Sequence, residues 1–330
     1  MNISSKGFAV PMVAAAAALV AVLCLGSGGI APARAETLRV GKVVAQNFGF
    51  VPLNVGVAQG YFKKQGLDID EIDFGGGAKQ QQAVAAGSVD IAIGGGTDMA
   101  FIAKGVPELA VAAITTSPAF MGYIVGADST VHSADDLKGK KIGVTTAGSL
   151  TRWLVDELNR VKGWGSGGAV PIAIGGQLST ELAALKTHEI DAFIDAPAIG
   201  YELETKKDGR LLFPVSDYVH DFDTFVIYAT DPLVKKNPDA IRRFLKAWFE
   251  SVAFMKTHKA ETVAITRKIT GFSQEVEERE YDLLMAQFSS DGKFDQKGLS
   301  KLRSSFTDLK ILPSPPDMTK LYTEAYLPKM

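Results

Sequence analysis

Short apolar stretches alternate with amphipathic stretches along most of this 330-residue chain. An apolar run of about four to eight residues between turns predicts a buried strand, and apolar positions spaced by three and four predict a helix. Strands are expected at residues 38–44, 67–74, 89–93, 109–115, 120–125, 141–145, 170–174, 190–194, 211–214 and 225–229. Helices are expected at residues 52–60, 79–86, 98–104, 150–161, 181–186, 197–206, 240–256 and 274–288. This alternation predicts βαβ units and an α/β fold with two mainly parallel sheets.

Two glycine turns, residues 75–77 and 94–96, each follow a predicted strand and precede a predicted helix. In an open α/β sheet such turns lie at the carboxyl ends of the strands, where small ligands bind. Glycine lets backbone N–H groups approach a ligand closely, and a helix N-terminus presents partial positive charge to it. The pattern therefore predicts a cleft for a small molecule.

The first 35 residues have the features of a secretory signal peptide. Lys6 is followed by an apolar core at residues 9–25 and by the small-x-small sequence Ala33-Arg34-Ala35. We expect cleavage after Ala35 and a periplasmic location for the mature chain. A membrane anchor is the alternative, since the apolar run approaches spanning length, but the cleavage sequence disfavours it. A lipoprotein would need a small residue before Cys24, where Leu23 stands.

Composition narrows the chemistry of the mature chain. Cys24 is the only cysteine and leaves with the leader, so no disulfide, thiol nucleophile or cysteine ligand is expected. The four histidines show no metal-ligand spacing, and we expect neither a metal nor a cofactor. The formal net charge is −2 and becomes more negative when Lys6 and Arg34 are removed, which argues against nucleic acid as a partner.

The order of predicted elements indicates two lobes. A second βα series begins near Lys140, and the aromatic-rich strands at residues 120–125 and 225–229 flank it on both sides. Two extended crossings would carry the chain to a second lobe and back. We expect lobe I to comprise residues 36–122 and 226–330, and lobe II to comprise residues 123–225.

Four sequence blocks match a known family: FVPLNVGVAQGYFKKQGLDID at residues 50–70, GGGAKQQQAVAAGSVDIAIGGGTD at residues 75–98, DDLKGKKIGV at residues 135–144 and EIDAFIDAP at residues 189–197. On these blocks the chain resembles the periplasmic solute-binding proteins of ABC importers, in the group that takes up sulfonates, taurine, nitrate and thiamine-pyrimidine precursors. The resemblance implies a type II periplasmic-binding-protein fold whose two lobes close on one small ligand by hinge motion. It also implies a monomer that docks on an ABC permease in the membrane.

The family's cleft lies where helix N-termini of both lobes meet, and the resemblance assigns it these residues: Gln46, Asn47, Phe48, Gly76, Gly77, Gly96, Thr97, Asp98, Thr146, Gly148, Ser149, Asp195 and Phe222. Simpler roles compete for several of them. Ser149 and Thr97 are good N-caps, and Asp98 and Asp195 also suit helix capping. Arg152 lies near the start of the helix that Ser149 caps and could reach an anion in the cleft, although a solvated arginine is the simpler interpretation. Phe48, Phe50 and Phe222 suit either ring stacking or core packing.

Charge leaves the ligand class open at this stage. A sulfonate-like organic anion is the first expectation, because hydroxyls and backbone N–H groups are available to hold it. A nitrogen heterocycle such as a pyrimidine precursor, or an aromatic acid, is the alternative. Two nearby carboxylates, Asp98 and Asp195, would oppose an anion and suit a ligand with an amine.

A secreted enzyme and a sensor domain are the competing functions. The sequence contains no G-x-S-x-G, H-E-x-x-H or P-loop motif. Fungal relatives that make the thiamine pyrimidine share this fold but rely on a cysteine-rich motif and a metal, whereas the mature chain lacks cysteine. A sensor would be favoured by a fused membrane segment, and no second apolar stretch is long enough to span a bilayer. The sequence therefore favours a binding protein over an enzyme.

Overall fold

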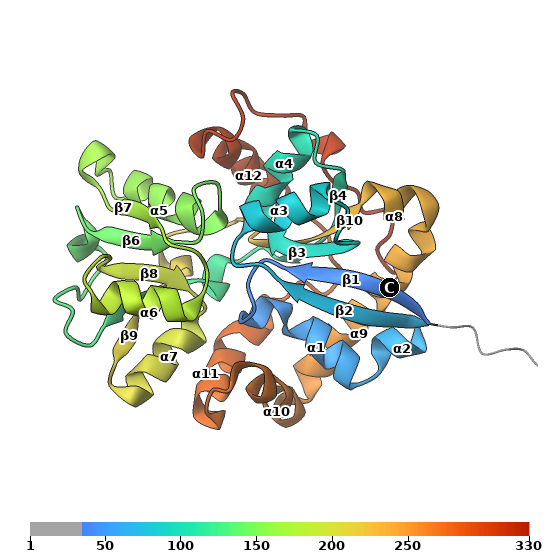
Figure 1. The fold of residues 1–330 in the computed structure, drawn as a ribbon, viewed down its shortest axis with the longest axis horizontal. Coiled ribbons are helices and arrows are strands. Elements are labelled where there is room, and N and C mark those ends of the chain that lie inside the picture. Colours follow the sequence, from blue (N-terminus) through green and yellow to red (C-terminus); the bar gives the residue numbers. More distant parts are fainter. Residues whose placement is uncertain (1–34, 330) are drawn as a thin grey trace, which may run out of the picture. The chain divides into compact units, whose positions relative to one another are not determined.

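In the computed structural model, which describes residues 35–329, the strands form two separate five-stranded sheets (Figure 1). The first sheet has the order β2-β1-β3-β10-β4 and the second has the order β7-β6-β8-β5-β9. Strands of the first sheet are β1 (Glu36–Lys42), β2 (Leu67–Asp73), β3 (Ile91–Gly95), β4 (Glu108–Thr115) and β10 (Phe225–Thr230). Strands of the second sheet are β5 (Gly122–Gly126), β6 (Lys141–Val144), β7 (Val170–Ala173), β8 (Ala192–Asp195) and β9 (Gly209–Pro214). The predicted signal peptide lies outside the described residues except for Ala35.

Both sheets are mixed, with one antiparallel strand at the same place in each. In the first sheet β1 runs parallel to β2 and β3, whereas β10 is antiparallel to β3 and β4. In the second sheet β6 runs parallel to β7 and β8, whereas β5 is antiparallel to β8 and β9. The antiparallel strand is in each case the one that follows a crossing from the other sheet. The two-sheet α/β fold predicted from the sequence is confirmed.

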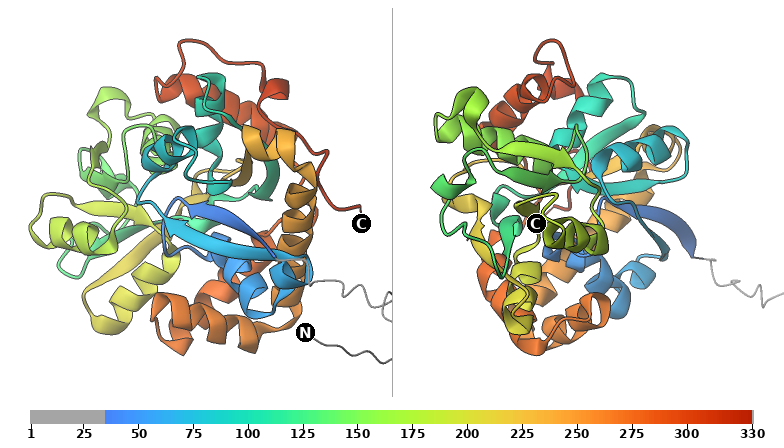
Figure 2. Two further views of the ribbon diagram at one scale, coloured as in Figure 1. Left: turned by 45° about the vertical axis from the view of Figure 1, so that its right-hand side comes forward. Right: turned by 60° about the vertical axis from the view of Figure 1, so that its left-hand side comes forward.

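Two segments connect the sheets. Residues 116–121 lead from β4 to β5, and residues 215–224 lead from β9 back to β10. The predicted lobe boundaries fall at the starts of β5 and β10. Figure 2 shows the two sheets from two further sides, with β1 and β2 in blue and β6–β9 in green to yellow.

Helices cover both faces of each sheet, which explains why two inner strands, β3 and β10, are buried along their whole length. The helices are α1 (Val51–Ala58), α2 (Tyr61–Lys64), α3 (Gly77–Ala85), α4 (Met99–Ala103), α5 (Leu150–Val161), α6 (Leu178–Lys186), α7 (Pro197–Lys206), α8 (Asp231–Lys236), α9 (Pro238–Thr257), α10 (Lys259–Thr270), α11 (Gln274–Leu284) and α12 (Gln296–Asp308). All residues of β3 and β10 are buried, whereas β2 lies at an edge and is largely polar. Among residues 35–329, no helix is long and apolar enough to cross a bilayer.

Local signals in the sequence account for most helix boundaries. Ser149 caps α5 as predicted, and its Oγ accepts a hydrogen bond from the N–H of Arg152 at 3.3 Å. The apolar stripe of α9 is buried as predicted, with Trp248 among its fully buried residues. Ser179 is a good capping residue just before the helix predicted at residues 181–186, but it does not cap that helix, because α6 begins at Leu178 and has Gln177 as its N-cap residue.

The C-terminal segment pairs with the edge of the first sheet. The N–H of Ala110 in β4 donates to the carbonyl of Leu321 at 3.1 Å, and the N–H of Thr323 donates to the carbonyl of Ala110 at 2.9 Å. This pairing covers the open edge of β4, which would otherwise expose unpaired backbone groups.

Candidate functional site

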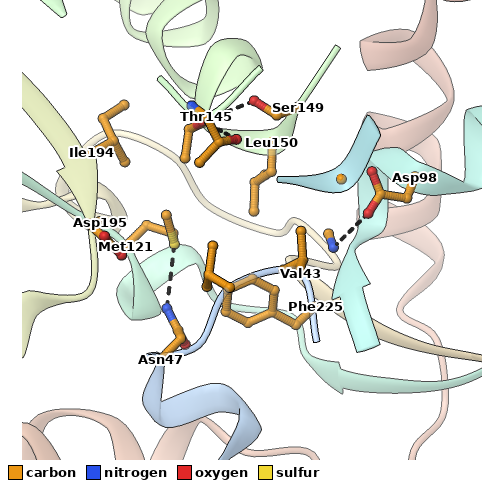
Figure 3. Close-up of a pocket in the computed structure, with 14 residues that line it drawn as sticks. Val43, Asn47, Asp98, Met121, Thr145, Ser149, Leu150, Ile194, Asp195 and Phe225 are labelled. Atoms are coloured by element: carbon orange, nitrogen blue, oxygen red, sulfur yellow. Dashed lines mark hydrogen bonds between the residues drawn. The ribbon is translucent and has the colours of Figure 1, made fainter. Parts of the chain in front are cut away.

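A cavity lies where the ends of strands from the two sheets approach each other (Figure 3). Its walls include the residues that follow β1 and β6 and those that end β3 and β8. The lining residues are Val43, Val44, Asn47, Gly77, Gly95, Asp98, Met121, Thr145, Ser149, Leu150, Thr151, Ile194, Asp195 and Phe225. We call this the first cavity. Its position at the carboxyl ends of parallel strands is where α/β sheets bind ligands.

Much of the wall is apolar. Figure 3 shows Val43 and Phe225 on one side of the cavity and Leu150 and Ile194 on another. The Phe225 ring is itself held by Phe50, with ring centroids 4.8 Å apart. These side chains would enclose the body of a flat or aliphatic ligand.

Asp98 lies at the start of two helices. Its Oδ2 accepts a hydrogen bond from the N–H of Gly95 at 3.1 Å, and its Oδ1 lies so close to Gly77 that a Cβ there would collide with it. Gly77 is the first residue of α3. Burial raises the pKa of Asp98 to about 7, against the opposing effect of the Gly95 N–H. The carboxyl is therefore able to change protonation state near neutral pH.

Asp195 provides the second carboxyl, at the end of β8. Its Oδ1 accepts a hydrogen bond from the N–H of Ala196 at 2.7 Å. Glu181 of α6 shares a hydrogen bond with it, and both carboxyls are buried. Burial raises the pKa of both groups, and Asp195 raises the pKa of Glu181 further, whereas the hydrogen bond from Glu181 favours the ionised form of Asp195. One proton shared by this pair is the arrangement that the geometry favours.

Three hydroxyls form a chain at the N-terminus of α5. The Ser149 and Thr151 oxygens are 2.9 Å apart, and those of Thr151 and Thr145 are 3.2 Å apart. The Ser149 hydroxyl donates to the carbonyl of Thr146 at 2.8 Å. This helix start thus carries neutral side chains rather than a carboxyl.

Asn47 is held by the protein itself. Its amide nitrogen donates to the carbonyl of Phe120 at 3.2 Å, and its amide oxygen accepts from the N–H of Gly49 at 2.9 Å. In Figure 3 it points toward Met121 across the lower part of the cavity. Asn47 therefore serves as a fixed polar wall.

The lining of the first cavity contains Asp98 and Asp195 but no lysine, arginine or histidine. Arg152, one turn into α5, instead pairs with Asp156 at 2.9 Å. Lys42 is buried beneath β2, where its Nζ lies 2.5 Å from Glu71 and 3.4 Å from Asp73. Within residues 35–329, no three His, Cys, Asp or Glu side chains are grouped so as to hold a metal.

The structure brings five of the residues expected at the site into the first cavity: Asn47, Gly77, Asp98, Ser149 and Asp195. Gln46 and Phe48 line a second cavity, which also includes Asn47. The others line neither cavity: Gly76, Gly96, Thr97, Thr146, Gly148 and Phe222. Thr97 and Phe222 are fully buried, and Gly148 lies beside Ile311.

Several lining residues were not expected. Met121 and Phe225 belong to the crossings, where the aromatic and apolar pattern indicated only strands. Thr145 ends the strand predicted at residues 141–145, and Leu150 begins the helix predicted at residues 150–161. Gly95 lies in the second glycine turn, which the sequence did single out.

Two glycine turns meet at the mouth of the first cavity. A Cβ at Gly176, in the loop after β7, would lie 3.1 Å from Val44 Cγ1 and 2.9 Å from Thr145 Cγ2. A Cβ at Gly76 would lie 2.8 Å from Thr146 Cγ2. Beside this contact an open groove includes Gln46, Gln177 and Asp195. The close approach leaves no space for additional side-chain atoms.

Solved structures with the same fold include periplasmic binding proteins. The alkanesulfonate-binding protein SsuA from Xanthomonas axonopodis pv. citri, solved with MOPS bound, matches with a TM-score of 0.71 and 17% identity, covering 85% of this chain and 95% of that chain. The periplasmic-binding-protein fold expected from the resemblance is thereby confirmed.

The chain belongs to the NMT1/THI5-like family, whose sequence model matches residues 47–262. Relatives include a protein named 4-amino-5-hydroxymethyl-2-methylpyrimidine phosphate synthase THI11 from Saccharomyces cerevisiae, 28% identical over 84% of both chains. They also include a protein from Brucella abortus named as a binding protein, 29% identical over 70% of both chains. The family thus contains proteins named as binding proteins and proteins named as synthases.

Proposed function

We propose that this protein is the extracytoplasmic solute-binding component of an ABC importer and that it captures an amino-substituted nitrogen heterocycle in the first cavity. The observation that carries the ligand class is the pair of buried carboxyls, Asp98 and Asp195, in a lining without any cationic side chain. The two lobes would close on the ligand and present it to a membrane permease. The protein would act as a monomer.

A carboxyl that titrates near neutral pH can form hydrogen bonds with the ring nitrogen and the amine of an aminopyrimidine. When protonated, it donates to a ring nitrogen and accepts from the exocyclic amine; when ionised, it accepts from the amine or from a protonated ring. Burial raises the pKa of Asp98 to about 7, so both forms are accessible there. The apolar walls around Phe225 would contact the faces of the ring.

A sulfonate-like anion, the first expectation from the sequence, is disfavoured by the same geometry. Two helix starts that would attract an anion face carboxyls of this chain instead: α3 faces Asp98, and α7 follows Asp195. Each carboxyl compensates the partial positive charge that a helix N-terminus presents. Among the helices whose starts line the first cavity, α5, capped by Ser149, begins without a carboxyl.

The test is a ligand screen on the mature chain, stripped of bound ligand by unfolding and refolding. The panel comprises 4-amino-5-hydroxymethyl-2-methylpyrimidine, the same ring without its amino group, ethanesulfonate, taurine, nitrate and benzoate. At about 100 times its Kd, a bound ligand raises the unfolding free energy by roughly 2.7 kcal/mol. We expect the aminopyrimidine to give this shift and the ring without the amine to give much less. A shift with ethanesulfonate and none with the heterocycles would overturn the ligand assignment.

Variants locate the contact. Asp98→Asn and Asp195→Asn are expected to weaken aminopyrimidine binding at least about tenfold, because a charged or proton-sharing hydrogen bond is lost. Asp68→Asn, at an exposed position on β2, is the matched control and should bind like the wild type. Equal affinity in all three variants would place the ligand elsewhere.

The synthase names among the relatives make an enzyme the competing function. We propose binding without chemistry, because Cys24 is the only cysteine of the chain and lies in the predicted leader. Mass spectrometry of the heterocycle after prolonged incubation with the protein separates the two functions. Recovery of unchanged ligand in full supports binding alone, whereas a stoichiometric or catalytic product would establish an enzyme.

A further inference from the structure

The second cavity has a different wall from the first, although the two share Asn47. It lies between the start of α1, the start of α7 and the pair α10–α11. Its lining residues are Ala45, Gln46, Asn47, Phe48, Val51, Asn54, Ala196, Ala198, Thr266, Ile269, Thr270, Phe272 and Glu280. Apolar side chains and neutral amides or hydroxyls make up this wall apart from one residue, Glu280.

Glu280 is the one charged side chain in the lining, and it is 2% exposed. Its Oε1 has no hydrogen-bond partner within residues 35–329. A buried carboxyl oxygen without a partner is costly, and native proteins normally satisfy such an atom with a donor. Because the Glu280 side chain lines a cavity, we infer that the donor comes from outside the chain.

The surroundings of Glu280 select a positively charged donor. Glu277 on the same helix and Asp195 at the end of β8 both add negative potential at its carboxyl. Arg267 of α10 and the hydroxyl of Thr270 favour the ionised form of Glu277, and Glu202 of α7 opposes it. Arg267 does not line the second cavity, so this cation is not beside Glu280 there. The N–H of Ala198, in the first turn of α7, is the one backbone group that favours the ionised form of Glu280.

We propose that the second cavity is a binding subsite for an ammonium-type cation, either ammonium itself or a small primary amine, with the Glu280 carboxylate as its counter-ion. The N–H donors of such a cation would satisfy Oε1, and the side chains of Phe48, Val51 and Phe272 would contact a methyl or methylene group. The subsite does not depend on the identity of the ligand in the first cavity.

Proton and cation compete for the same carboxyl. Burial and the neighbouring Glu277 raise the pKa of Glu280, so binding of a cation releases a proton. Affinity should therefore rise with pH, by up to about tenfold per pH unit while the carboxyl is mostly protonated. A primary alkylammonium stays charged throughout this range, so the change reports on the protein.

The experiment is equilibrium dialysis of the mature chain with radiolabelled methylammonium chloride at pH 6 and pH 8, with ionic strength held constant by NaCl. We expect saturable binding of one methylammonium per chain, tighter at pH 8, and competition by ammonium chloride but not by KCl. Glu280→Gln should abolish the binding. This variant should still fold, because the amide removes a buried ionisable group and keeps its shape, and a thermal melt checks this.

Glu275→Gln, an exposed change in the first turn of the same helix, is the matched control and should bind methylammonium like the wild type. Absence of saturable binding in the wild type, equal binding in folded Glu280→Gln, or equal competition by KCl would each overturn the proposal. The heterocycle screen uses different probes and different variants. The heterocycle screen can therefore fail while methylammonium still binds, and the reverse, so the two proposals are tested independently.

Discussion

The rings of Trp153 and Phe222 stack with centroids 4.1 Å apart and with planes inclined by only 10°. Trp153 belongs to α5, whose first turn lines the first cavity, and Phe222 belongs to the segment that leads back to the first sheet. Both side chains are fully buried. The contact therefore fastens the returning crossing to the helix that carries Ser149, and it links the connection between the sheets to the wall of the cavity.

Phe222→Ala should destabilise the fold strongly. Removal of a large, fully buried ring leaves a cavity against Trp153, and such changes lower the free energy of unfolding by about 3–5 kcal/mol. Urea denaturation of the mature chain measures this change. Val57→Ala, at a side chain that is 51% exposed, is the control and should stay within about 0.5 kcal/mol of the wild type. A Phe222→Ala variant as stable as this control would contradict the packing described.

Gly176→Ala should weaken ligand binding without preventing folding. The added Cβ would lie 3.1 Å from Val44 and 2.9 Å from Thr145, at the contact between the two glycine turns. Under the proposed hinge closure this overpacking, typically about 1–3 kcal/mol, disfavours the closed form in particular. We expect an affinity about 5- to 150-fold lower by calorimetry.

Gly167→Ala is the matched control for that change, because a Cβ at Gly167 would have open space around it. It should bind ligand like the wild type. Small-angle scattering with and without ligand gives an independent measure, since Gly176→Ala should resist the compaction that ligand causes in the wild type. Full compaction together with wild-type affinity would show that this contact has no role in closure.

Stability should fall as the pH rises from 5 to 8, and Asp98 should account for part of the fall. Its pKa is raised from 3.8 to about 7 by burial, so the folded chain holds this proton more tightly than the unfolded chain. The stabilisation is complete below about pH 4 and is lost as the pH rises through about 7. In Asp98→Asn the fall in unfolding free energy between pH 5 and pH 8 should be smaller by roughly 1–3 kcal/mol.

Chemical denaturation at the two pH values, with Asp68→Asn as the control, measures that difference. The unfolding free energy of Asp98→Asn should still fall between pH 5 and pH 8, because burial also raises the pKa of Glu108 to about 8 and that of Asp223 to about 7. An unchanged pH dependence in Asp98→Asn would mean that Asp98 is ionised throughout this range in the folded chain.

N-terminal sequencing of the protein recovered from the periplasm should begin at Glu36. Glu36 is the first residue of β1, and its carboxylate pairs with Arg243 at 2.7 Å and accepts from the Asn237 amide at 2.7 Å. Cleavage after Ala35 would therefore leave every strand intact. Replacement of Ala33 and Ala35 by glutamine should leave the precursor uncleaved, and a mature chain beginning elsewhere would contradict the predicted site.

Local pattern was sufficient for most elements of the fold. The start of α5 follows from the hydroxyl of Ser149, and the buried face of α9 follows from its spacing of apolar residues. Ser179 shows the limit of such signals, since a good capping residue stands one position inside the helix that actually forms. The start of a helix can differ from the one that its capping residue predicts, because packing against the sheet outweighs the stabilisation of about 1 kcal/mol that a cap provides.

The sequence by itself determined the two-sheet α/β fold and the turns around the first cavity, because periodicity and glycine turns act over a few residues. Only the tertiary structure decided the rest. Glu280 reaches a cavity beside Asn47 from the far end of the chain, and Phe222 is packed against Trp153. Asp195 meets Glu181 from a neighbouring helix, and burial sets their protonation. Burial and the pairing of distant residues depend on the whole fold, which no local pattern encodes.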